Sequence, residues 1–247
     1  MPAALPPEYE TWRRGAAGAI VRRDVASAVR AALEQRGSLY AWAATQPGRE
    51  AFAGRGAAYG VTLGGVAAVV RHARRGGLLG PLLGDRYAGA PRHLRELAWS
   101  RRLAGAGIPT PPFLAGITYA AGLAHRADVA TERVAGLDLA GFFFGDTTPG
   151  PDARDATWHA VGRLVRSLHD AGWVHPDLQL RNVLVGGRPP QAWLLDVESC
   201  RDATGAAARR RNLERFYRSW AKWNRLRGPR LGDRDRAAFD GGYAGRP

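Results

Sequence analysis

The sequence predicts an α+β fold with two lobes, a small β-rich N-terminal lobe and a reduced, mainly helical C-terminal lobe. Two observations favour this class. Strand-like and glycine-rich segments fill much of the first half, and amphipathic helices flank two short apolar runs in the second half. Strands followed by helices is the order typical of α+β proteins. We expect a single domain over residues 1–247, with the N-lobe and an N-terminal extension over about 1–135 and the C-lobe over about 136–247.

The N-terminal half is expected to open with an extended segment and a short helix, and then to form strands. Val25, Val29 and Leu33 recur at helical spacing. Gly54 and Gly56 precede a β-rich apolar run over residues 61–71. A glycine-rich turn between two strands lets backbone N–H groups approach phosphates closely, so these two glycines are candidate nucleotide-binding residues. A plain glycine-rich hairpin is the alternative.

Three later segments have the periodicity of amphipathic helices. They cover residues 91–103, 155–168 and 213–223. Pro91 suits a first helical turn and Gly105 a helix end. Asp155 is a candidate N-cap, since its side chain can accept a hydrogen bond from an unpaired backbone N–H group. A short strand is expected at residues 130–134, followed by Gly136 as a candidate hinge between the lobes.

The composition indicates a globular and strongly basic protein. The hydrophobic content is 45% and the formal net charge is +14, which attracts phosphate-rich partners such as an anionic membrane, a nucleic acid or a phosphorylated glycolipid. Cys200 is the single cysteine, so no internal disulfide is expected and a reducing cytosol fits. The sequence shows neither a signal-peptide pattern nor an apolar run long enough to span a bilayer, which predicts a soluble or peripherally bound protein.

The segment most informative about function joins a polar loop to two short apolar runs. The pattern H-x-D-x-x-x-x-N runs from His175 through Asp177 to Asn182, and Asp196 ends an apolar run fourteen positions later. This is the catalytic-loop and metal-loop pattern of the protein-kinase-like superfamily. Asp177 is then expected to accept the proton of the attacking hydroxyl, and Asn182 and Asp196 to hold Mg²⁺ at the phosphates of ATP. We expect His175 to brace the loop; an ordinary Asp/Asn turn between strands is the alternative.

The same mechanism requires a cation on an N-lobe strand, paired with a glutamate on a helix. No lysine precedes Lys222, and Arg71 stands at the end of the apolar run, so Arg71 is the candidate phosphate-binding residue. Glu96, in the expected helix over residues 91–103, is its candidate partner. Arginine holds phosphate through a planar fork and is not a simple replacement for lysine. An active kinase and a degenerate pseudokinase are both compatible with this change; the intact polar motif favours the active kinase.

From Gly54 to about Leu226 the chain resembles the lipopolysaccharide kinase family, in particular its 3-deoxy-D-manno-octulosonic acid (Kdo) kinase branch. The resemblance lies in residues 70–78, 85–87, 107–111, 131–136, 168–178 and 212–215. It implies a kinase-like fold, with ATP and Mg²⁺ as cofactors. It also implies phosphorylation of a Kdo hydroxyl on a lipid A precursor by a cytoplasmic protein bound peripherally at the inner face of the inner membrane.

The short chain after Asp196 favours a glycolipid or small-molecule acceptor. It has no Ala-Pro-Glu motif and too few residues for the peptide-binding platform of a protein kinase. The resemblance is densest at Arg74 and Arg75, which are candidates for contacting the acceptor or the membrane; a solvated basic surface is the alternative. Heptose, another small molecule and a protein remain alternative acceptors. An inactive scaffold that binds anionic membrane or nucleic acid is the alternative outside enzymes, whereas a kinase is expected to bind no nucleic acid and to have no disulfide-linked partner.

Overall fold

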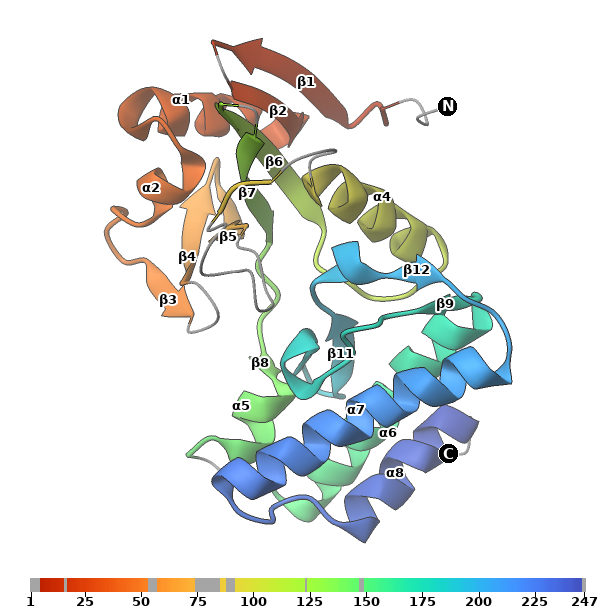
Figure 1. The fold of residues 1–247 in the computed structure, drawn as a ribbon. Helices are drawn as coiled ribbons and strands as arrows, with labels where there is room; N and C mark the ends of the chain where they lie inside the picture. The colour runs from red at the N-terminus through yellow and green to blue at the C-terminus, as the bar shows by residue number, and fades with distance from the viewer. Residues whose placement is uncertain are drawn as a thin grey trace. The chain divides into compact units, whose positions relative to one another are not determined.

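The computed structural model describes residues 5–15, 17–52, 57–73, 85–87, 92–122, 124–146 and 149–245. The chain divides into two compact units (Figure 1). The first comprises Met1–Ala98 and Pro112–Arg133, and the second Trp99–Pro111 and Val134–Pro247. Each unit has a hydrophobic core of its own. The mixed composition of helix and antiparallel sheet confirms the predicted α+β class.

The first unit is built on a seven-stranded antiparallel sheet in the order β1-β2-β6-β7-β5-β4-β3 (Figure 1). Its strands are β1 (Tyr9–Arg14), β2 (Ala17–Arg22), β3 (Glu50–Phe52), β4 (Ala58–Leu63), β5 (Val66–His72), β6 (Phe113–Ala121) and β7 (Ala124–Glu132). Helices α1 (Ala26–Arg36) and α2 (Leu39–Ala43) pack on this sheet. Val21 of β2, Val29 of α1 and Val70 of β5 are fully buried in the shared core, so the apolar positions of helix and strands stabilise one another.

Three strand predictions for this unit are corrected. The extended start is the β1–β2 hairpin. The β-rich run over residues 61–71 divides at Gly64 and Gly65, whose φ angles of 60° and 82° close a tight hairpin between β4 and β5. The short strand at 130–134 is the end of the longer β7, which pairs with β6. Strand β6 lies between two other strands and is buried over its first five residues, so it lacks the alternating pattern that marks a strand in a sequence.

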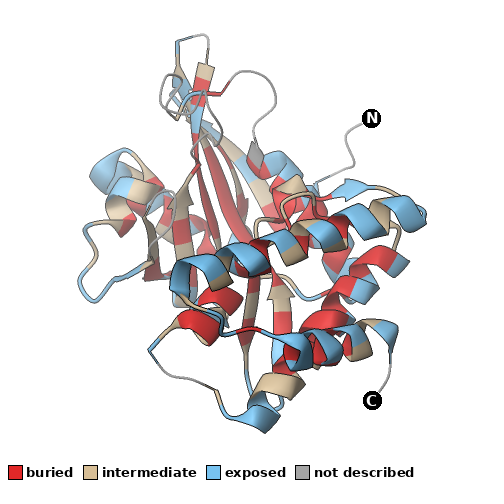
Figure 2. Cartoon of the chain, turned by 60° about the horizontal axis from the view of Figure 1, so that its bottom comes forward, coloured by how far each residue is buried: buried red, intermediate tan, exposed pale blue. Residues whose placement is uncertain are grey.

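The second unit is mainly helical. Its helices are α5 (Leu139–Phe144), α6 (Pro151–Asp170), α7 (Ala206–Arg227) and α8 (Asp233–Ala244), and helix α4 (Arg92–Gly105) contributes residues to both units. Its strands are β8 (Leu137–Asp138), β9 (Trp173–Val174), β10 (Val183–Gly186), β11 (Gln191–Leu194) and β12 (Arg201–Asp202). Buried residues alternate along β10 and β11 and gather on one face of the long helices (Figure 2). Trp158 lies at the centre of this core and stacks on Phe143 and Trp220, with ring centroids 4.6 and 4.5 Å apart.

The predicted role of Asp155 as an N-cap is wrong. Helix α6 begins four residues earlier, with Pro151 in its first turn and Gly150 as the N-cap residue. Proline fits there because its missing N–H would have no partner in the first turn of a helix. Asp155 instead binds Arg234 of α8 at 2.8 Å, so its carboxylate joins two helices rather than capping one.

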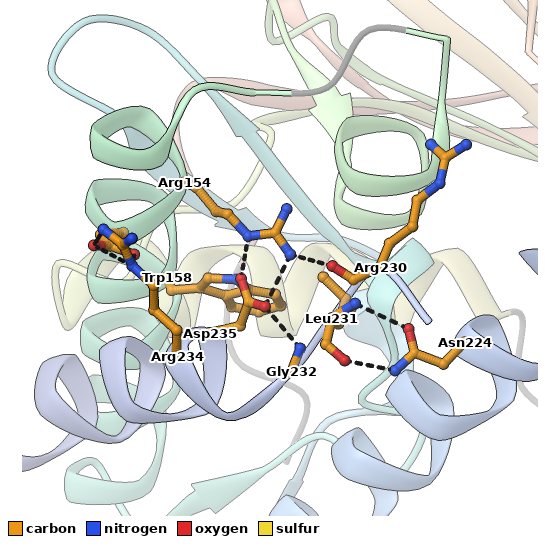
Figure 3. Close-up of polar contacts among 9 residues, drawn as sticks. Arg154, Trp158, Asn224, Arg230, Leu231, Gly232, Arg234 and Asp235 are labelled. Atoms are coloured by element: carbon orange, nitrogen blue, oxygen red, sulfur yellow. Dashed lines mark hydrogen bonds and ion pairs between the residues drawn. The ribbon is translucent and has the colours of Figure 1, made fainter. Parts of the chain in front are cut away.

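Asp235 at the start of α8 is a second link between α8 and α6 (Figure 3). Both of its carboxylate oxygens accept hydrogen bonds from the guanidinium of Arg154, and the indole of Trp158 donates to the same carboxylate at 2.8 Å. The backbone N–H of Gly232 donates to it at 2.8 Å. Burial raises the pKa of Asp235, but the bonds from Arg154 and Gly232 outweigh burial and leave the pKa below its ordinary value.

Asp235→Ala is expected to lower the free energy of unfolding by about 3–5 kcal/mol, because it leaves the indole N–H of buried Trp158 unpaired and removes the carboxylate that pairs with the partly buried guanidinium of Arg154. A group with a depressed folded pKa stabilises the fold above its unfolded pKa, and this contribution is lost as the pH falls through the folded value. Urea unfolding of wild type and variant should therefore differ most near neutral pH and converge in acid. Asp240→Ala is the control: it removes an exposed carboxylate on the same helix that accepts from the hydroxyl of Tyr217 at 2.7 Å, and it should cost only about 1 kcal/mol. An equal loss in both variants would contradict the assignment.

Candidate active site

The β10–β11 hairpin presents two of the predicted site residues at one end. Val183 pairs with Leu194 in the antiparallel register, so Asn182 just before β10 and Asp196 just after β11 lie at the same end of the hairpin. The backbone N–H of Leu195 also donates to the carbonyl oxygen of Asn182 at 2.9 Å. The predicted pair of short strands with both polar residues at one end is therefore present.

Asp177 is held from three directions in the loop that precedes this hairpin. Asn182 donates through its amide nitrogen to the backbone carbonyl of Asp177 at 2.8 Å. Gln179 donates to one carboxylate oxygen of Asp177 at 3.1 Å, and Arg215 donates to the other at 2.6 Å. The side chain of Asp177 is 31% exposed. The carboxylate is thus fixed in direction and still open to solvent, as a group that receives a proton from a substrate must be.

Asp196 occupies the left-handed region of backbone conformation, with φ of 56°. Residues other than glycine are uncommon there, although aspartate tolerates it better than most. The 3-10 turn Val197–Ser199 follows immediately and turns the chain away from β11. Such a conformation at a predicted metal ligand is consistent with a functional demand on the direction of this side chain.

His175 braces the loop, in the role expected from the sequence. It is fully buried, and its Nε2 atom lies 3.0 Å from the carbonyl oxygen of Leu195, the residue before Asp196. Burial lowers the pKa of His175, which favours a neutral ring that donates one hydrogen bond. Asn212 of α7 donates to the carbonyl oxygen of His175 at 2.6 Å. Cys200 is also buried, and burial raises the pKa of its thiol to about 12, so it is not a nucleophile.

The donor set at the hairpin suits a hard divalent cation. The carboxylate of Asp196 and the amide oxygen of Asn182 are both oxygen ligands, which Mg²⁺ prefers in combination with waters and phosphate oxygens. The amide nitrogen of Asn182 is the atom that binds Asp177, so its oxygen remains for a cation. Within the part of the chain that the structure describes, no cluster of three or more His, Cys, Asp or Glu residues forms a closed metal site. Two protein ligands, with phosphate oxygens of the substrate and waters in the remaining coordination positions, are the arrangement that Mg²⁺ usually has in proteins.

In the first unit, Arg71 of β5 pairs with Glu96 of α4. One guanidinium nitrogen lies 2.5 Å from each carboxylate oxygen of Glu96. The side chain of Glu96 is 4% exposed and that of Arg71 is 30% exposed. The pairing expected from the sequence is present, with the carboxylate buried and the cation reaching the surface. This arrangement fixes the direction of the guanidinium while leaving it accessible to an anion.

His72, next to Arg71, lies between two carboxylates. Its Nδ1 atom is 2.6 Å from Asp128 and its Nε2 atom is 2.9 Å from Asp85. Asp128 is fully buried and also accepts a hydrogen bond from the hydroxyl of Tyr119 at 2.8 Å. A histidine donates from both ring nitrogens only when it is protonated. The hydrogen bond to Asp128 accordingly raises the pKa of His72, against the lowering effect of burial and with the help of Asp85.

The His72 ion pairs are expected to make stability depend on pH. A group whose folded pKa is raised stabilises the fold fully below its unfolded pKa, near 6.5, and the contribution is lost as the pH rises through the folded value. The difference in unfolding free energy between wild type and His72→Gln should therefore be largest near pH 6 and shrink toward pH 9. Chemical denaturation across this range measures it, and a difference that grows with pH would refute the ion-pair interpretation.

The described residues include five of the nine predicted site residues, in two groups. Arg71 and Glu96 lie together in the first unit, and Asp177, Asn182 and Asp196 lie together in the second. The other four predicted residues, which are Gly54, Gly56, Arg74 and Arg75, lie outside the described residues.

The sequence reasoning gave no role to two residues that contact Asp177. Gln179 carries no motif of its own. Arg215 stands in a helix with many arginines, of which most face solvent, so neither residue type nor periodicity distinguishes it. The family resemblance includes the segment from Asn212 to Arg215, and it is the one feature of the sequence that points to Arg215.

The fold, together with the loop and hairpin motif, is that of a kinase-like protein. The family model of the lipopolysaccharide kinase (Kdo/WaaP) family matches residues 41–243, and the chain belongs to this family. It is 34% identical over 174 residues to the 3-deoxy-D-manno-octulosonic acid kinase of Photobacterium profundum, covering 68% of this chain and 71% of that protein. Identity to the enzyme of the same name from Vibrio parahaemolyticus is 30% over 186 residues, covering 73% and 76%.

A solved structure supports the same fold assignment. The structure described as WaaP in complex with acyl carrier protein superposes with a TM-score of 0.53 at 23% sequence identity. The match covers 80% of this chain and 79% of that one. At this level of identity the likeness establishes the kinase-like fold, which confirms the fold predicted from the sequence.

Arg71→Gln is expected to weaken ATP binding about tenfold, the loss of one charged contact to phosphate worth about 1.4 kcal/mol. Glutamine keeps a donor for buried Glu96, so the fold should be retained. Titration calorimetry with ATP and Mg²⁺ measures the effect. Arg95→Gln, an exposed change on α4, should leave the affinity unchanged, and equal affinities in all three proteins would exclude Arg71 from the nucleotide site.

Proposed function

We propose that this chain transfers the terminal phosphoryl group of ATP to a hydroxyl of a Kdo sugar on a lipid A precursor, in assembly of the lipopolysaccharide inner core. Membership of the lipopolysaccharide kinase family makes it an ATP-dependent kinase acting on a sugar. The relatives named as Kdo kinases support Kdo as the acceptor. The observation that carries the assignment is the fixed carboxylate of Asp177 beside the Asn182 and Asp196 pair.

Asp177 is the proposed catalytic base. An acceptor hydroxyl that donates a hydrogen bond to its carboxylate is aligned for attack on the phosphoryl group, and Asp177 takes the proton as the new O–P bond forms. The contacts from Gln179 and Arg215 restrict rotation of the carboxylate. Because positioning supplies much of the rate enhancement in phosphoryl transfer, a carboxylate fixed in this way is the main contribution that the loop makes.

Six other residues are proposed to form the nucleotide and metal site. Asn182 and Asp196 would hold Mg²⁺, which neutralises charge on the phosphate oxygens when it is bound. Arg71 is proposed to contact the phosphates, with Glu96 fixing its direction. The guanidinium of Arg71 suits an anionic ligand by its charge, and Glu96 acts only through its pairing with Arg71. Gly54 and Gly56 are proposed to line the phosphates, on their position in the sequence alone.

The protein is proposed to bind its acceptor, an anionic glycolipid, at the inner face of the inner membrane. The net charge of +14 supports attraction to such a surface, and Arg74 and Arg75 are proposed to contribute to it. Among the described residues, no helix has the length and apolar character needed to cross a bilayer. Association through surface charge is therefore the mode proposed, and it should weaken as salt screens the charges.

The proposal is tested by transfer of labelled phosphate from ATP to a lipid A precursor that carries one Kdo residue. Asp177→Asn is expected to lower kcat by about 10²–10⁴-fold, the usual contribution of a general base, while ATP still binds. Asp196→Ala is expected to abolish the Mg²⁺ dependence of ATP binding, because it removes the charged ligand of the pair.

The matched control is Asp152→Asn, a change at an exposed aspartate in the first turn of α6, which should transfer phosphate at the wild-type rate. Full activity of both Asp177→Asn and Asp196→Ala would refute the site. No transfer by the wild type to the Kdo acceptor, with ATP bound normally, would refute the acceptor and leave the kinase assignment in place.

A further inference from the structure

Helix α7 lies along the catalytic loop and contacts it with one polar face. Asn212, Arg215 and Ser219 are spaced three and four residues apart, which places them on the same side of a helix. Asn212 binds both backbone groups of His175, accepting from its N–H at 3.2 Å and donating to its carbonyl oxygen at 2.6 Å. Ser219 accepts from the backbone N–H of Leu180 at 3.2 Å. The helix therefore supports the loop at both ends.

Between these two supports, Arg215 contacts the loop at its reactive side chain. One nitrogen of its guanidinium lies 2.6 Å from a carboxylate oxygen of Asp177 and 3.4 Å from the side-chain oxygen of Gln179. The amide nitrogen of Gln179 donates to the other carboxylate oxygen of Asp177 at 3.1 Å. The three side chains thus form a closed ring of contacts in which both carboxylate oxygens have a donor.

The contact of Arg215 with Asp177 is more exposed to solvent than the contacts of Asn212 and Ser219 with the loop. Asn212 and Ser219 are 4% and 3% exposed, and both bind backbone atoms. The side chains of Arg215 and Asp177 are 29% and 31% exposed. A partly exposed ion pair contributes little to stability, and α7 is already anchored by its buried residues Phe216 and Trp220. The Arg215–Asp177 pair is therefore not needed to hold the helix in place.

We propose that Arg215 is a positioning residue for phosphoryl transfer, which holds the carboxylate of Asp177 in the orientation that receives the proton of the acceptor hydroxyl. The proposal rests on the function proposed above for Asp177. One guanidinium nitrogen of Arg215 contacts both Asp177 and Gln179, and the planar group holds the direction of that donor more firmly than the freely rotating ammonium of a lysine would. Since α7 is attached to the loop by Asn212 and Ser219, the guanidinium starts from a rigid base, and rotation of the Asp177 side chain would break its charged hydrogen bond.

The test compares kcat and KM of Arg215→Ala with those of wild type in phosphate transfer to the Kdo-bearing lipid A precursor. Misplacement of the base predicts a fall in kcat of about 100-fold, with the KM for ATP and the thermal unfolding temperature unchanged. Arg215→Lys keeps the charge without the planar fork and should recover part of the lost kcat. Arg218→Ala, which removes an exposed arginine one turn along the same helix, should match the wild type.

A second comparison separates positioning of Asp177 from an independent effect. Adding Arg215→Ala to Asp177→Asn should cause no further loss of kcat, because a residue that acts through Asp177 has nothing left to position. Multiplicative losses in the double variant, or wild-type kcat in Arg215→Ala, would overturn the proposal. If Arg215→Ala lowers the unfolding temperature, Arg215→Gln, which retains a neutral donor, is compared in its place.

The same variants distinguish failure of this proposal from failure of the proposed function. If wild type transfers no phosphate to the Kdo acceptor, the acceptor assignment is wrong, and the rates are measured for Mg²⁺-dependent hydrolysis of ATP instead. A loss in Arg215→Ala, together with a double variant no slower than Asp177→Asn, would then support the positioning role. Unchanged hydrolysis in Arg215→Ala alongside a loss in Asp177→Asn would refute it.

Discussion

Two hydrogen bonds of Asn182, one from its side-chain amide and one to its backbone carbonyl, are the constraint on which the proposed catalytic residues depend. Its amide nitrogen binds the carbonyl oxygen of Asp177 at 2.8 Å, and its own carbonyl oxygen accepts from Leu195 at 2.9 Å. One residue thereby ties the loop that carries Asp177 to the strand end that carries Asp196. Both bonds use backbone atoms of the partner, so they fix the spacing of the two chain segments, and the same side-chain amide also lies 3.4 Å from a carboxylate oxygen of Asp177.

This constraint is supported in turn by buried polar groups on the long helices. The side-chain oxygen of Asn212 on α7 accepts from the backbone of His175 at 3.2 Å and lies 3.0 Å from Nε2 of His169 on α6. Its amide nitrogen is also used, by the carbonyl oxygen of His175. A buried amide with its donor and acceptor both satisfied specifies one arrangement of its neighbours, because any other would leave polar atoms unpaired. The helical core thus determines the loop geometry, rather than merely enclosing it.

The sequence predicted what is local and could not predict what is distant. The motif from His175 to Asp196 is contiguous, so its hairpin and the position of its polar residues follow from short-range rules. Arg215 reaches Asp177 from 38 positions away, and nothing in the helical pattern of α7 separates it from its exposed neighbours. Strand β6 was missed because its burial on both sides removes the alternation that reveals a strand. Asp155 was misassigned because a capping preference is a local signal, whereas its real partner, Arg234, lies on another helix.

Three contacts between an arginine and a carboxylate show what the abundance of arginine over lysine contributes to the structure. Arg71 reaches both oxygens of Glu96, Arg154 reaches both oxygens of Asp235, and Arg215 contacts Asp177 and Gln179 together. Each contact joins a guanidinium to two acceptors. Arg154 uses two nitrogens of its planar group, whereas Arg71 and Arg215 each use one nitrogen for both acceptors. At these three positions an arginine orients a carboxylate within one unit. At Asp177 the guanidinium restrains the carboxylate and leaves it partly exposed, and the proposed role of Asp177 as a catalytic base requires both.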